Sequence, residues 1–158
     1  MKLKLASLFL MLLLPSAEAL QLTVPIQTNI LKPENSSNLI IEYERDVFSA
    51  AYKQEKQTFD DILIPFTVKT SSSTSELYKI TLQDSYHVCE DDPINVSVSI
   101  DATSVAKGDF IDDLDFLMDD ADFKWTEHRM NLHFPKIVAG LKSKSCQGNV
   151  GILVELKV

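Results

Sequence analysis

The three histidines of this sequence, His87, His128 and His133, are its first candidates for acid–base or metal chemistry. His128 and His133 lie five residues apart, so on a strand they would face opposite sides and could not share a metal. A zinc site at His87 and Cys89 would also need Cys146. No G-x-S-x-G, H-E-x-x-H or Gly-rich phosphate loop is present. The sequence therefore predicts no enzyme, no cofactor and no metal site, and a small hydrolase is the weaker hypothesis.

A second candidate for chemistry is a run of seven aspartates: Asp109, Asp112, Asp113, Asp115, Asp119, Asp120 and Asp122. Asp113 and Asp115 fit the first two ligand positions of a calcium loop. Leu117 and Met118 then stand where that loop needs an oxygen ligand and a glycine, so the EF-hand interpretation fails. We expect a solvated acidic loop, with an irregular cation site or a cationic partner as the alternatives.

The first 19 residues have the pattern of a secretory signal peptide. Lys2 and Lys4 precede a short apolar run at 5–14, and A-x-A follows at 17–19. Cleavage there would leave a mature chain of residues 20–158 in an exported compartment. Cys89 and Cys146 are the only cysteines, and they are expected to form one disulfide in an oxidising compartment.

The length fits one domain, with a second only if both were small, and the composition is acidic. The 158 residues carry 15 Lys and Arg against 23 Asp and Glu, a formal net charge of −8. A basic surface for nucleic acid is therefore not expected. Only 4 glycines and 6 prolines are present, which argues against a low-complexity chain.

Apolar residues alternate with polar ones in most of the mature chain, which predicts strands. The expected strands lie at 20–31, 39–43, 61–70, 77–82, 94–100, 130–134 and 150–158. Residues 46–56 and 110–118 could instead each form one or two helical turns. Short strands joined by polar connections predict an all-β fold, a β-sandwich or barrel.

The two terminal strands are the most distinctive. The apolar face of the N-terminal strand comprises Leu20, Leu22, Val24, Ile26 and Ile30, with Thr28 as its one polar member. Pro25 lies on the other face and suggests an edge or a bulge. The C-terminal strand presents Val150, Ile152, Val154, Leu156 and Val158. Such an apolar strand is expected to be buried in a sheet.

This layout resembles the pilin subunits of chaperone–usher fimbriae, of the alternate, colonisation-factor or common-pilus type. The resemblance is based on the signal peptide, the N-terminal strand LQLTVPIQTNI, the strand count and the C-terminal segment GNVGILVELKV. It implies an immunoglobulin-like β-sandwich that lacks its last strand and is completed by donor-strand exchange. Residues 20–31 would then be the donor strand and 32–158 the pilin domain, with residues 150–158 beside the acceptor groove.

The resemblance also implies partners and a location. They are other fimbrial subunits joined head to tail, a periplasmic chaperone, an outer-membrane usher and a host surface receptor. The subunit would pass through the periplasm to the fimbrium at the cell surface, as a structural or adhesive pilin. Lys157 stands where many common-type pilins carry an aromatic residue, and glycine is scarce for a shaft subunit, so a minor or tip subunit stays open. The alternative is a monomeric secreted binding domain whose N-terminal strand completes its own sandwich.

Overall fold

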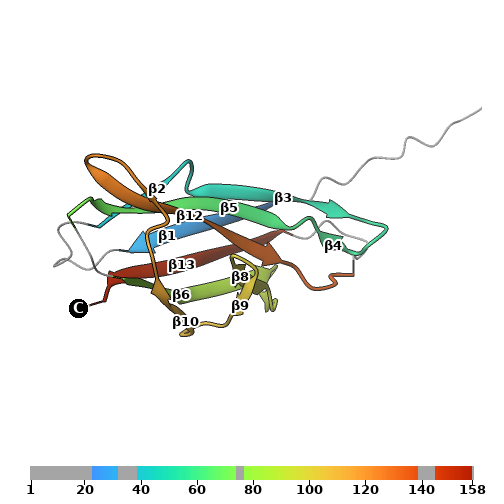
Figure 1. Cartoon of the computed structure of the whole chain (residues 1–158). Helices are drawn as coiled ribbons and strands as arrows, with labels where there is room; N and C mark the ends of the chain where they lie inside the picture. The colour runs from blue at the N-terminus through green and yellow to red at the C-terminus, as the bar shows by residue number, and fades with distance from the viewer. Residues whose placement is uncertain (1–22, 32–38, 74–76, 139–144, 158) are drawn as a thin grey trace, which may run out of the picture.

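The computed structural model describes residues 23–31, 39–73, 77–138 and 145–157, and every regular element within them is a strand. The predicted signal peptide lies outside these residues. Two sheets pack face to face as a β-sandwich (Figure 1). The all-β prediction and the sandwich are therefore confirmed. Within the described residues no helix is long and apolar enough to cross a membrane.

The strand order of the two sheets differs strongly from the order in the sequence. The first sheet contains, side by side, β10 (Phe110–Leu114), β6 (Tyr78–Cys89), β13 (Cys146–Leu156), β1 (Thr23–Leu31), β3 (Val47–Lys53) and β4 (Thr58–Phe59), and β7 (Asp92–Pro93) pairs with β6. The second contains β2 (Ile40–Tyr43), β5 (Ile62–Ser71), β12 (Phe123–His133), β8 (Ser97–Ile100) and β9 (Thr103–Val105), and β11 (Met118–Asp119) pairs with β12.

The core forms because alternate side chains of each strand point between the sheets. On β5 the inward residues Ile62, Ile64, Phe66 and Val68 are all buried, while Leu63 on the opposite face is 54% exposed. Burial of each large apolar side chain contributes roughly 1.5–3 kcal/mol. The core therefore spans both sheets from β5 and β12 to β6 and β13.

Cys89 and Cys146 form the predicted disulfide. They are directly opposite each other in the antiparallel ladder between β6 and β13. The bond joins residues 57 apart in the sequence, and a closure of this size contributes about 4 kcal/mol in loop-entropy models. It fixes the end of β13 that lies nearest to the start of the β1 pairing.

The two segments expected to form helical turns are strands. In β3, Phe48 and Ala50 are buried and Val47 is 51% exposed, which is the alternation of a strand. Residues 110–114 pair with β6 as β10. Helical spacing of a few apolar residues was the signal in 110–118, and pairing with a neighbouring strand overrides such a local preference.

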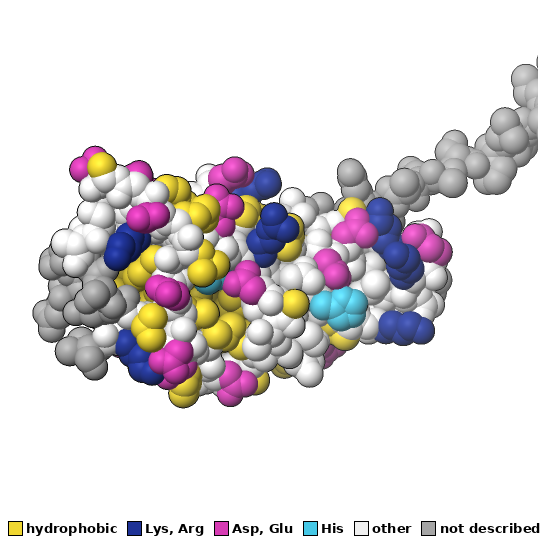
Figure 2. Space-filling view, viewed as in Figure 1, with side chains coloured by type: hydrophobic (Ala, Val, Ile, Leu, Met, Phe, Trp, Pro, Cys, Tyr) yellow, Lys and Arg dark blue, Asp and Glu magenta, His cyan; other side chains and the backbone are white. Residues whose placement is uncertain are grey.

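Residues 106–122 cross from the first sheet, where β10 pairs with β6, to the second, where β11 pairs with β12. The predicted acidic loop is thus partly strand, although all its aspartates except Asp112 are exposed. Lys157 Nζ donates to Asp112 and Asp113 at 2.9 and 2.7 Å, which ties the crossing to the end of the chain. Acidic side chains and apolar ones share the face shown in Figure 2.

Candidate functional site

The site that the sequence singled out is the N-terminal strand, and the structure places β1 between β13 and β3 (Figure 1). β1 runs parallel to β13, with Ile26 opposite Gly148 and Ile30 opposite Ile152. It runs antiparallel to β3, with Thr23 opposite Ala51 and Gln27 opposite Val47. We call the space that β1 occupies, between β13 and β3, the β1 slot.

Among the predicted donor residues, only Ile26 has a side chain that the structure describes. Ile26 is fully buried in the core. Val24 and Ile30 belong to β1 by their backbone, and their side chains are outside the described part, as are Leu20 and Leu22 altogether. Pro25 pairs with Ser49 of β3 and precedes Ile26, the first β1 residue paired with β13. Pro25 thus lies just before the β13 ladder begins, but β1 is an interior strand of its sheet, so the edge position predicted for it is wrong.

The predicted residues of the C-terminal strand line one wall of the slot. Val150, Ile152 and Val154 are fully buried, Leu156 is partly buried, and Val158 lies outside the described residues. Phe48 and Ala50 of β3 are the buried residues of the opposite wall. The structure therefore brings the two terminal strands side by side, and the sequence had not predicted that they pair within one chain in parallel.

Gly148 is required by the side chain of a neighbouring strand. A Cβ atom at position 148 would lie 2.1 Å from His87 Nδ1, far inside contact distance. The His87 ring on β6 thus covers Gly148, which faces Ile26 of β1 in the register. The first glycine of the G-x-x-G segment therefore has a packing reason that the sequence did not reveal.

Stability is expected to fall between pH 6.5 and 4 because His87 is buried. Burial lowers the pKa of His87 to about 4 from its usual 6.5, and the Asp84 carboxylate opposes this only in part. In that range the unfolded chain binds more protons than the folded one, so acidification favours unfolding by on the order of 3 kcal/mol.

His87→Phe keeps a ring over Gly148 and removes the titration. Urea midpoints at pH 7 and pH 4.5 measure the effect, and the drop should be clearly smaller in the variant than in the parent chain. Equal drops in both proteins would contradict the assignment to His87.

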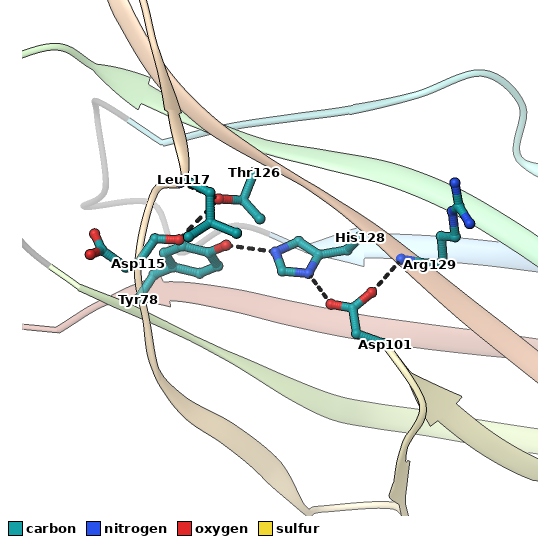
Figure 3. Close-up of polar contacts among 7 residues, drawn as sticks. All are labelled: Tyr78, Asp101, Asp115, Leu117, Thr126, His128 and Arg129. Atoms are coloured by element: carbon teal, nitrogen blue, oxygen red, sulfur yellow. Dashed lines mark hydrogen bonds and ion pairs between the residues drawn. The ribbon is translucent and has the colours of Figure 1, made fainter.

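A polar network that is buried at Tyr78 and His128 and reaches the surface at Asp101 joins the two sheets (Figure 3). Tyr78 Oη lies 2.6 Å from His128 Nε2, and His128 Nδ1 lies 2.5 Å from Asp101 Oδ2. A carboxylate only accepts, so Nδ1 carries a proton, and in the neutral ring Nε2 accepts from the Tyr78 hydroxyl. Asp101 Oδ1 in turn accepts the Arg129 backbone N–H at 2.9 Å. The network ties β6 to β12 and to the turn between β8 and β9.

Within this network the Tyr78 hydroxyl is not available as a base. Tyr78 is fully buried, and burial raises the pKa of its hydroxyl to about 12, so it stays protonated and cannot serve as a base. His128 is stacked on Phe66 and is 3% exposed. His128 and His133 do face opposite sides of β12, as predicted from their spacing. Within the described residues no group of three or more His, Cys, Asp or Glu side chains could hold a metal ion.

A half-open cavity of about 350 Å³ lies between β6 and the hairpin of β8 and β9. Hydroxyl and amide groups and apolar side chains share its lining, among them Ser85, Asn95, Ser97, Ser104, Leu82 and Val105. It is large enough for a small ligand.

The comparisons with known proteins do not identify relatives: no family model and no curated protein matches this chain.

Proposed function

We propose that this protein is an exported structural subunit, a pilin of immunoglobulin-like type, that assembles by donor-strand exchange. The observation that supports this most directly is the position of β1 between β13 and β3. After cleavage at the predicted site, β1 would be joined to the rest of the domain only through residues 32–38. Its departure would break no pairing between other strands, although it would divide the first sheet between β13 and β3.

The physical basis of assembly is the slot that a departing β1 leaves behind. Two strand edges, on β13 and β3, would lose their backbone partners, and the buried wall of Val150, Ile152 and Phe48 would face water. An open edge of this kind pairs readily with another chain. A second copy carries the matching strand, and because donor and acceptor surfaces differ, the contact repeats head to tail into an open filament.

The other partners in this proposal come from the resemblance. A periplasmic chaperone would cover the slot before assembly, and an outer-membrane usher would pass subunits to the fimbrium. A tip or minor subunit would in addition contact a host surface receptor.

The alternative function is a secreted binding domain that remains a monomer. It is favoured by the pairing of β1 within its own chain and by the cavity beside β6. The two functions differ in whether β1 ever leaves its slot.

The test uses a cysteine pair across β1 and β3. Gln27 and Val47 face each other in the register and both side chains are exposed, so Gln27→Cys with Val47→Cys should form a cross-strand disulfide. Residues 20–158 with this pair are purified and then concentrated, either oxidised first or kept in a mild reductant that opens the exposed pair and leaves the buried Cys89–Cys146 bond closed. We expect the reduced chain to assemble into species of high mass, measured by size-exclusion chromatography, and the oxidised chain to remain monomeric.

The matched control pairs Gln27→Cys with Ala51→Cys, because Ala51 is exposed on the same strand and lies opposite Thr23 instead of Gln27. It should assemble under both conditions. A reduced Gln27/Val47 chain that remains monomeric at every concentration would contradict donor-strand exchange and favour the binding domain.

A further inference from the structure

Thr28 of β1 buries a hydroxyl group that has no partner. The residue is 4% exposed, lies opposite Val150 and follows Ile26 on the inner side of the strand. Its backbone N–H is satisfied, because it donates to Asp46 O at 2.9 Å. Thr28 Oγ1 makes no hydrogen bond although it is shielded from solvent. A buried hydroxyl without a partner disfavours the state that buries it.

Thr126 shows how the same side chain is accommodated elsewhere in the core. It is 6% exposed, and its Oγ1 accepts from Leu117 N and donates to Asp115 O, both at 2.9 Å. Among the described residues, only His87 Nδ1 and Asp112 Oδ1 share the unsatisfied state of Thr28, and neither belongs to β1. The strand proposed to exchange, β1, therefore contains an unsatisfied buried hydroxyl, whereas the hydroxyl of Thr126 on β12 has both of its partners.

The unsatisfied hydroxyl of Thr28 affects the equilibrium between β1 in its slot and β1 released from it. When β1 leaves its slot, water can hydrogen-bond to the Thr28 hydroxyl. The open state is therefore stabilised relative to the closed state. The loss of one buried partner corresponds to about a ten- to hundredfold change in an equilibrium constant. If β1 enters the same slot in an identical copy, the hydroxyl meets the same surroundings, and the balance between the two end states does not change.

We propose that Thr28 is the residue that sets how readily β1 is released from its own domain, and thereby the rate of strand exchange. This inference rests on the proposed function, because it names the residue that regulates the exchange. An aliphatic residue at position 28 would close the domain more firmly and would slow assembly. Its final extent would not change.

The experiment compares the mature chain with Thr28→Val, which keeps the shape of the side chain and removes the hydroxyl. Hydrogen exchange of the β1 amides measures opening, and the growth of high-mass species by size-exclusion chromatography measures assembly. We expect both rates to fall about ten- to hundredfold, with the same final yield. The matched control is Thr126→Val, which removes a hydroxyl that has both partners and should not slow the exchange of β1 amides.

The outcomes separate this inference from the proposed function. Slower β1 exchange together with slower assembly in Thr28→Val supports the inference. If the parent chain assembles and Thr28→Val assembles at the same rate, the role of Thr28 is overturned and donor-strand exchange stands. If the parent chain does not assemble at all, the proposed function is overturned and the role of Thr28 in assembly falls with it.

Discussion

A chain without residues 20–31 is expected not to fold as a stable monomer, and a peptide of residues 20–31 is expected to restore its fold. β1 has a strand on each side, so its removal exposes one edge of β13 and one of β3 at once. Ile26 loses its buried site, and the buried side chains of Val150 and Ile152 lose their cover.

The loss exceeds what a domain of this size tolerates. Burial of a single large aliphatic side chain contributes roughly 1.5–3 kcal/mol, and the slot contains several. A whole domain is stable by only about 5–15 kcal/mol. The backbone bonds of β1 to two strands add to the loss, so the truncated chain should aggregate through its open edges.

Thermal unfolding of residues 32–158 with and without the peptide measures the effect, and a rise of the midpoint by tens of degrees is expected. A peptide with Ile26→Asp is the matched control, because it brings a charge to a fully buried position and should not bind. A truncated chain that is a stable monomer without peptide would show that the sheet does not depend on β1.

Much of the fold could be predicted from period-two alternation because both sheets have one buried face. The strand expected at 61–70 is β5, and the one expected at 150–158 is the second half of β13. The prediction of 94–100 as one strand was too long, since β8 begins at Ser97 and Ile94 N donates instead to His87 O. A strand ends where its neighbouring strand stops pairing with it, and the identity of that neighbour cannot be read from the local sequence.

The candidate site was predictable in its parts and not in its arrangement. The apolar positions Ile26, Val150 and Ile152 follow from alternation and are buried. That β1 and β13 are parallel neighbours could not be derived, because alternation shows which face is buried and does not identify the neighbouring strand. The unsatisfied hydroxyl of Thr28 is likewise a property of the neighbours, and the only signal was a polar residue within an apolar series.

His128→Ala is expected to lower the free energy of unfolding by about 4–6 kcal/mol, a large part of the stability of a single domain. The substitution removes a buried ring that is stacked on Phe66 at 5.2 Å between centroids. It also leaves the Tyr78 hydroxyl without its acceptor inside the core. A buried donor that loses its partner costs about 1–3 kcal/mol in addition to the lost packing.

The matched control for this substitution is His133→Ala on the same strand. Its side chain is 66% exposed and pairs with an exposed Asp61, so a change of less than about 0.5 kcal/mol is expected. Tyr78→Phe removes only the hydroxyl and should cost about 1–3 kcal/mol, because His128 Nε2 is then unpartnered.

Urea unfolding of the two single variants and the double variant measures the coupling between these residues. In the Tyr78→Phe background, His128→Ala should lower the free energy of unfolding by about 1–3 kcal/mol less than in the parent chain. The reason is that the Tyr78 hydroxyl, which His128→Ala would leave without an acceptor, is already absent. Strictly additive costs would show that the bond between β6 and β12 contributes nothing. The contact between the two sheets at this point would then rest on apolar packing.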